Sequence, residues 1–159
     1  MPAKSKSVIP ALWAAANHLS ALRGKVAIAN AKLAYASYQA LIASERWNAL
    51  AKRGARPQRL LWASTGTKNP LYRDVLYVEE LIGQETVNTM PPATLDAFRD
   101  HGDARATLAS DIGGAREVLA GLERAGISLS SVTDRLLAEG VKLFDDAFAK
   151  LLAALHAKL

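Results

Sequence analysis

One short polar stretch of this chain, Ser64 to Lys68, holds residue types suited to binding a phosphate group. It reads STGTK, lies within WASTGTKNP at positions 62–70, and follows the apolar run 60–63. Hydroxyls and the backbone amides of small residues donate hydrogen bonds to a phosphate oxyanion, and an ammonium group supplies the opposite charge. The spacing is not GxxxxGK followed by Ser or Thr, which disfavours a nucleotide P-loop. On the residues alone, Lys68 is a nucleophile, a phosphate clamp or a solvated charge in a polar turn.

The surrounding pattern puts this stretch at the end of a predicted strand. The apolar run 60–63 predicts a buried strand, and the β-branched pair within 86–89 predicts a second one. Between them, Asp74 has the character of a helix start, and Gly83 that of a stop. Strand, helix and strand in this order indicate an α/β unit with parallel strands. Ligands of such folds bind beyond the carboxyl ends of the strands, where this polar stretch would lie.

The remainder of the chain has the periodicity of helices. In the C-terminal part, Ser130 or Ser131 is the predicted N-terminal cap of a helix, and Gly140 is predicted to end that helix. His101 is predicted to end a helix and to complement its dipole. The pair Glu79 and Glu80 reads as a solvated helix face. The predicted helices cover residues 8–22, 25–43, 45–52, 91–98, 115–125, 132–138 and 141–158.

Composition limits the classes of function. The 159 residues are half hydrophobic, include no cysteine and carry a formal charge of +5. The absence of cysteine excludes disulfides and thiolate chemistry, argues against structural zinc and suits a cytoplasmic protein. The charge is spread along the chain with no aromatic–basic platform, so we expect no nucleic-acid partner. Apolar runs are broken before the roughly 18 residues of a membrane span, and histidines lack metal-ligand spacing, so we expect neither membrane insertion nor a metal.

Three runs of the sequence resemble the transaldolase family. They are RGARPQRLLWASTGTKNPLYRDVLYVEELIGQETVNTMPPATLDAFRDHG, GKVAIANAKLAYASYQ and LLAEGVKLFDDAFAKLLAAL, and the resemblance covers Leu22 to the C-terminus. It is closest to the branch found as a stand-alone bacterial enzyme or fused to phosphoglucose isomerase. The resemblance implies an α/β fold, the C-terminal portion of a (β/α)8 TIM barrel. It also implies transfer of a dihydroxyacetone unit between sugar phosphates in the pentose phosphate pathway, through a lysine Schiff base and without a cofactor.

The resemblance also assigns roles within the polar stretch. LLWAS resembles the seventh barrel strand and TVNTM the eighth, and Ser64 occupies the serine position that contacts the substrate phosphate. Lys68 takes the cationic role of a phosphate clamp, which makes it not the Schiff-base lysine. Its short hydrophilic loop agrees, because a nucleophilic lysine needs burial or a neighbouring cation to lower its pKa. Further candidates are Thr65 and Thr67 as phosphate donors, and Tyr72, Asn88 and Thr89 as site-lining residues.

The chain departs from the family in its length and in its start. A complete barrel needs about 250 residues, and the regions resembling the first five strands, the Schiff-base lysine and the proton-relay carboxylate are absent. We therefore expect no catalytic residue within this chain. Residues 1–21 read as an atypical segment joined to a barrel portion, 22–159. Two parallel strands leave open edges, so we expect self-association or a complementary half-barrel. The alternative function is a non-catalytic helical interaction or oligomerisation module derived from a transaldolase.

Overall fold

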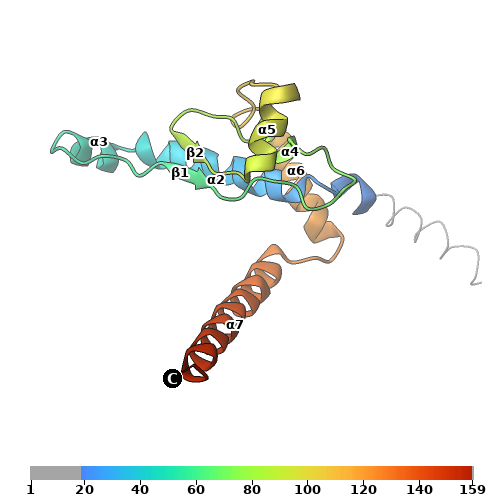
Figure 1. The fold of residues 1–159 in the computed structure, drawn as a ribbon. Coiled ribbons are helices and arrows are strands. Elements are labelled where there is room, and N and C mark those ends of the chain that lie inside the picture. The colour runs from blue at the N-terminus through green and yellow to red at the C-terminus, as the bar shows by residue number, and fades with distance from the viewer. Residues whose placement is uncertain (1–18, 159) are drawn as a thin grey trace, which may run out of the picture.

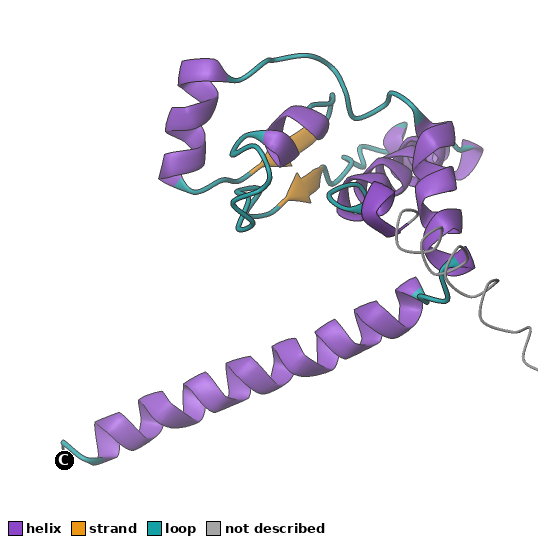
Figure 2. Ribbon diagram, turned by 90° about the vertical axis from the view of Figure 1, so that its right-hand side faces the viewer, coloured by secondary structure: helices purple, strands orange, loops and turns teal. Residues whose placement is uncertain are grey.

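The computed structural model describes residues 19–158, and it is built mainly of helices (Figures 1 and 2). Residues 19–22 are helical, while the remainder of the predicted helix 8–22 and most of the segment 1–21 lie outside the described residues. In chain order the elements are α2 (Val26–Ile42), α3 (Glu45–Ala51), β1 (Leu60–Trp62), α4 (Leu76–Glu80), β2 (Thr86–Asn88), α5 (Pro92–His101), α6 (Ile112–Arg124) and α7 (Leu129–His156).

The two strands form a parallel pair, as the sequence predicts. Leu60 pairs with Thr86 and Trp62 with Asn88, so both strands end at the same edge of the sheet. Leu60 and Trp62 pack against the core, and the alternation of a strand then turns Leu61 to the opposite face. Leu61 is 53% exposed, so the prediction of a buried strand is wrong for one face of the sheet.

The core lies between α2 and the segments that follow the two strands. Tyr35, Leu81 and Leu108 form its centre, and Leu108 is fully buried. The Tyr35 hydroxyl donates a hydrogen bond to the carbonyl oxygen of Gln84 at 3.1 Å, which satisfies its polar end. α6 packs along the same helix α2. α2 is therefore the element to which both the strand region and α6 are anchored.

α4 is shorter than its sequence pattern predicts. It begins at Leu76 after Val75, which gives no side-chain cap, and it ends at Glu80 before Gly83 is reached. The carboxylate of Asp74 instead lies 2.9 Å from the imidazole of His101. Asp74 is therefore not the cap of α4, because its side chain is used in a contact with α5.

α6 begins before its predicted start, and its cap, Asp111, lies outside the predicted helix 115–125. Asp111 adopts a left-handed backbone with φ 52°, and its carboxylate accepts a hydrogen bond from the backbone N–H of Gly114 at 2.9 Å. Aspartate is a favoured cap and tolerates this conformation. The helix therefore begins at Ile112, three residues before the predicted start at residue 115.

α7 is one continuous helix of 28 residues, so the predicted break at Gly140 is wrong. A glycine in a helix interior costs about 1 kcal/mol relative to alanine, which the long flanking segments offset. The cap is Ser128, whose hydroxyl accepts from the N–H of Ser131 at 3.3 Å. Figures 1 and 2 show α7 extending away from the other elements, and none of its residues is buried.

Candidate functional site

The loop after β1 is tied to the end of β2 by a short hydrogen-bond ladder. Beyond the paired strands, the N–H of Thr89 donates to the Trp62 carbonyl at 2.9 Å, and the N–H of Thr65 donates to the Thr89 carbonyl at 3.2 Å. Ser64, which lies between Trp62 and Thr65 in the chain, has a left-handed backbone with φ 58°. The chain therefore turns sharply where the strand ends, and the loop starts at the carboxyl edge of the sheet.

Side chains strengthen this connection. The Thr65 hydroxyl donates to Oδ1 of Asn88 at 2.6 Å, and Thr65 is only 5% exposed. The N–H of Ser64 donates to the hydroxyl oxygen of Thr89 at 3.3 Å. The structure thus brings four of the predicted site residues together, two from each strand end: Ser64, Thr65, Asn88 and Thr89.

Gly66 lets the loop pass close to the start of α5. A Cβ atom built at Gly66 would lie 2.8 Å from Oγ1 of Thr94 and 3.1 Å from Cγ of Pro91. The first of these distances is shorter than real Cβ atoms show, so a side chain here would force the loop away from the helix. The glycine therefore serves the close approach of the loop backbone to the side chains of Pro91 and Thr94.

Three side chains of the loop have polar ends that the described residues leave unpaired. Ser64 and Lys68 are exposed, and Thr67 is half-buried. Within residues 19–158, the hydroxyls of Ser64 and Thr67 and the ammonium of Lys68 make no hydrogen bond or ion pair. Two hydroxyl donors and one positive charge thus stand on a loop whose backbone is held by the sheet.

A cavity of about 320 Å³ lies beside this loop, against α2 and α4. Its walls are mainly apolar, and the buried indole N–H of Trp62, which lines it, has no hydrogen-bond partner among the described residues. Of the three residues with unpaired polar side chains, Ser64 lines this cavity, whereas Thr67 and Lys68 do not. The lining residues are Ala27, Ile28, Trp62, Ala63, Ser64, Thr65, Gly66, Tyr77 and Leu81.

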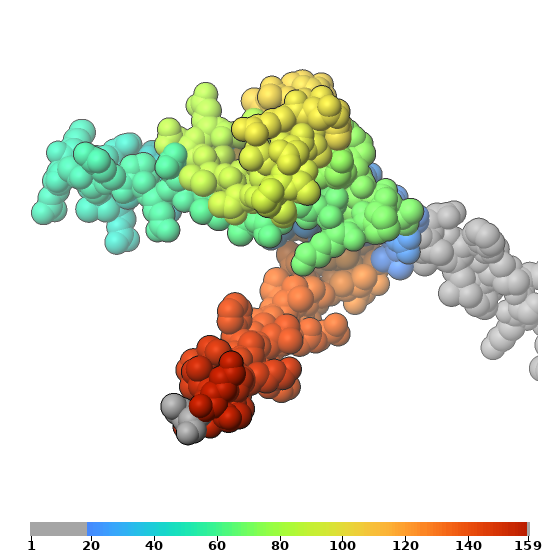
Figure 3. Space-filling view, in the orientation of Figure 1, coloured from blue at the N-terminus to red at the C-terminus, as the bar shows by residue number. Residues whose placement is uncertain are grey.

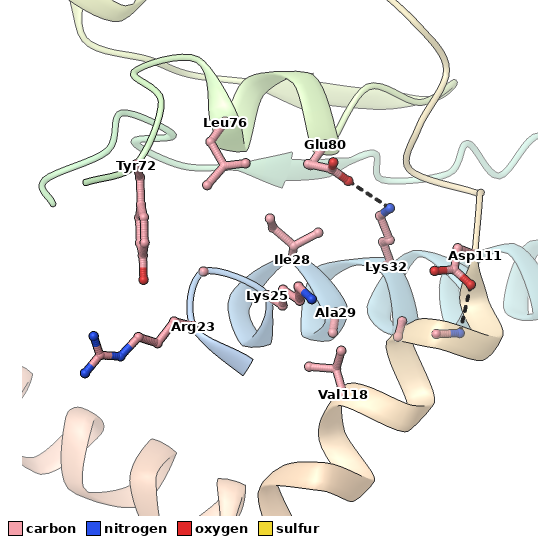
Figure 4. Close-up of a pocket in the computed structure, with 13 residues that line it drawn as sticks. Arg23, Lys25, Ile28, Ala29, Lys32, Tyr72, Leu76, Glu80, Asp111 and Val118 are labelled. Carbon is pink, nitrogen blue, oxygen red and sulfur yellow. Dashed lines mark hydrogen bonds and ion pairs between the residues drawn. The ribbon is translucent and has the colours of Figure 1, made fainter. Parts of the chain in front are cut away.

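Tyr72 lines a different pocket, of about 540 Å³, in which none of the residues from Ser64 to Lys68 takes part. This pocket lies between α2, α4 and α6, and the Tyr72 ring stands at one end of it (Figure 4). The ring packs on Gly24, whose added Cβ would lie 3.4 Å from it. The exposed basic side chains of Arg23 and Lys25 also line the pocket. They were not predicted as site residues, although they lie at the start of α2, which has no side-chain cap.

The two glutamates of α4 are ion-paired, so the prediction of a solvated pair is wrong. Glu79 forms a bidentate pair with Arg73, with N–O distances of 2.7 and 3.0 Å, and also accepts from the N–H of Asp103. Glu80 lies 3.0 Å from the ammonium of Lys32, which is buried on α2 (Figure 4). Both carboxylates therefore connect α4 to neighbouring segments, which a helical pattern alone does not indicate.

His101 ends α5 as predicted, and it joins that helix to the segment before α4. Its Nε2 lies 2.9 Å from Asp74 and its Nδ1 3.1 Å from Asp100. The hydrogen bond with Asp74, and then that with Asp100, raises the pKa of His101 above 6.5. The same contact lowers the pKa of Asp74 below 3.8. These exposed groups fit a surface link between elements, not a catalytic pair.

The described residues contain no group of three or more His, Asp or Glu side chains placed to hold a metal ion. Among them, no helix has the combined length and apolarity that crossing a membrane requires.

Comparison with known proteins places this geometry in a family. The family model described as "Transaldolase/Fructose-6-phosphate aldolase" matches residues 8–155, a range that begins within the segment 1–21 set apart above. The "Transaldolase" of Trichodesmium erythraeum is 49% identical over 143 residues, 89% of this chain and 38% of that protein. "Transaldolase 1" of Streptomyces coelicolor is 52% identical over 139 residues, 87% and 36%. The "Transaldolase" of Thermobifida fusca is 53% identical over 133 residues, 83% and 36%.

The chain thus spans little more than a third of the length of these relatives. The resemblance and the fold class predicted from the sequence are confirmed, since the family fold is a (β/α)8 barrel and the chain has helices around two parallel strands. The chain belongs to the transaldolase/fructose-6-phosphate aldolase family.

Proposed function

We propose that this chain provides the phosphate-binding end of a transaldolase site, which serves transfer of a dihydroxyacetone unit between sugar phosphates. One observation carries the proposal. A loop leaves the carboxyl edge of two parallel strands, where barrel enzymes bind their ligands, and it carries two hydroxyls and an ammonium that have no partner among residues 19–158. The family membership supplies the substrate class.

The loop residues divide into binding and positioning roles. Ser64 and Thr67 donate hydrogen bonds to the phosphate oxygens, and Lys68 supplies charge. The Thr65 hydroxyl already donates to Asn88, and the Thr89 hydroxyl oxygen accepts from a backbone N–H. We therefore propose that Thr65, Thr89 and Asn88 hold the loop in its conformation and do not contact the phosphate.

The covalent step of the proposed reaction uses a lysine that we place outside this chain. A lysine amine condenses with the ketose carbonyl and releases water, and the protonated imine then accepts the electron pair of the breaking carbon–carbon bond. Lys68 is exposed on its loop, and the buried Lys32 is ion-paired with Glu80. Neither has the unpaired, desolvated ammonium that favours a nucleophile. The reaction so written needs no metal or organic cofactor.

The proposed site requires further strands. Leu61 is exposed on the uncovered face of the sheet, and within the described residues β1 and β2 each have one unpaired edge. Unpaired edges and exposed apolar faces favour pairing with further strands. We propose that a complementary half-barrel covers this face in the active assembly. Division of the chain at residues 21 and 22, and action in the cytoplasm, stay predictions from the sequence.

Calorimetric titration tests the phosphate role. Fructose 6-phosphate should bind the full chain more tightly than fructose. The ratio of the two dissociation constants should fall about tenfold or more in Lys68→Met, because one charge-assisted contact is lost. Lys52→Met, which removes an exposed charge outside the loop, is the matched control. Equal binding of the two sugars, or equal effects of the two substitutions, would overturn the proposal.

Borohydride trapping tests the absence of the nucleophile. Reduction in the presence of fructose 6-phosphate should leave this chain without a stable sugar adduct, as measured by its intact mass. A stable adduct would show that a Schiff-base lysine lies within the chain, and an adduct on Lys68 would also remove its role as a clamp.

The alternative function, a non-catalytic interaction or oligomerisation module, is favoured by the apolar exposure of α7. This alternative predicts that the chain associates specifically and equally well in the wild type and in Lys68→Met, and that neither fructose 6-phosphate nor fructose binds.

A further inference from the structure

α7 carries six large apolar side chains in a single stripe. Their spacing alternates between four and three residues, which is the a and d pattern of a coiled-coil heptad. All six are more than half exposed, and Phe144 reaches 83%. We call this set the α7 stripe: Leu137, Val141, Phe144, Phe148, Leu151 and Leu155.

The opposite side of the helix is charged. Arg135 pairs with Glu139 at 3.0 Å and Lys142 with Asp146 at 2.9 Å, each four residues along the helix. Such pairs support an exposed helical face. Because α7 stands clear of the other elements (Figures 1–3), the described residues leave the α7 stripe uncovered. A contiguous apolar surface of this kind is typical of an interaction site.

We propose that the α7 stripe pairs with the α7 stripe of a second copy of this chain, in antiparallel orientation. The spacing is symmetric about position 146, so a two-fold axis there places Phe144 of each copy against Phe148 of the other. Position 141 then faces 151, and position 137 faces 155. Each layer combines one a and one d position, as antiparallel pairing requires.

The charges at the two ends of the stripe decide its orientation. One step beyond the stripe in each direction, the heptad reaches Asp134 and Lys158. In the antiparallel pair these residues of opposite sign face each other across the interface at both ends. In a parallel pair, Asp134 would face Asp134 and Lys158 would face Lys158. Including these end layers, the seam runs for about three and a half heptads, the length at which such a pattern is significant.

The overall charge of the helix has the same asymmetry. Residues 129–146 contain four acidic and two basic side chains, a net charge of −2, and residues 147–158 contain two lysines, a net charge of +2 with histidine neutral. Antiparallel pairing therefore sets the negative half of each helix beside the positive half of its partner. Complementary charge of this kind selects orientation more than it adds affinity.

Sedimentation equilibrium of the full chain tests the surface. We expect a concentration-dependent dimer, and the double substitution Phe144→Glu with Phe148→Glu should weaken it more than about tenfold, because carboxylates would enter the apolar seam. The control, Ala149→Glu with Ala153→Glu, adds the same charges at the same spacing away from the stripe. A monomer at all concentrations, or equal weakening by both pairs, would overturn the proposal.

Disulfide cross-linking tests the orientation, and a chain without cysteine makes the result unambiguous. Leu137→Cys and Leu155→Cys should each give little cross-linked dimer alone, and a mixture of the two should give a mixed disulfide dimer. Efficient cross-linking of Leu137→Cys with itself would show a parallel pair and overturn the assigned orientation. None of these substitutions touches the loop that binds phosphate in the proposed function, so the two proposals fail separately.

Discussion

Replacing Thr65 with valine removes the hydroxyl that joins the candidate loop to β2 while keeping the shape of the side chain. The lost contact is the 2.6 Å hydrogen bond to Asn88, at a position only 5% exposed. A hydrogen bond of this kind contributes about 0.5–1.5 kcal/mol, and an acceptor left without its donor in a partly buried place adds to the cost. We expect the free energy of unfolding to fall by about 1–2 kcal/mol.

Thermal unfolding followed by circular dichroism measures this change at one protein concentration. The midpoint should fall by about 2–8 °C for a chain of this size. Thr67→Val is the matched control, because the half-buried Thr67 hydroxyl has no partner within residues 19–158 and its loss should cost less than about 0.5 kcal/mol. If the two valine variants had the same unfolding midpoint, or if the midpoint of Thr65→Val equalled that of the wild type, the assignment of Thr65 to loop positioning would be wrong.

Two further predictions concern packing and pH. Gly83→Ala should lower the free energy of unfolding by about 1–3 kcal/mol, because its Cβ would lie 2.6 Å from the fully buried Leu108, whereas Gly113→Ala meets nothing within 4 Å and should be neutral or stabilising. Denaturant titration of both variants checks this, and equal losses would refute it. Because the pKa of His101 is raised in the folded chain, its pairing with Asp74 stabilises the fold below about pH 6.5 and this gain is lost as the pH rises through the raised pKa. His101→Asn should therefore lose less stability than the wild type between about pH 5.5 and pH 8, and parallel pH profiles would contradict the link.

The pairing of the strands was predictable from local sequence, and the details of the helix ends were not. An apolar run followed by turn residues marks the end of a strand, and β1 ends within one residue of its predicted limit. Asp74 has the composition of a cap, but its carboxylate contacts His101, a residue far along the chain. Gly140 has the composition of a break, but a single glycine costs too little to stop a helix of this length.

The candidate site shows the same division. The sequence indicates which residues follow each strand, and parallel pairing then brings Thr65 and Asn88 together. It does not indicate that the Thr65 hydroxyl donates to Asn88 while the described part of the chain leaves the hydroxyls of Ser64 and Thr67 unpaired, because this depends on the backbone turn at Ser64. Nor does it place Tyr72 in a separate pocket, since the loop between residues 68 and 75 has no regular periodicity.

An NMR titration of the full chain with inorganic phosphate, followed through its backbone amide signals, tests the central claim most directly. The phosphate-loop assignment predicts that the largest shifts fall on residues 64–68, weaken with added salt, and disappear in Lys68→Met. Shifts concentrated instead on Arg23 and Lys25 would contradict it and move the phosphate site to the pocket lined by Tyr72.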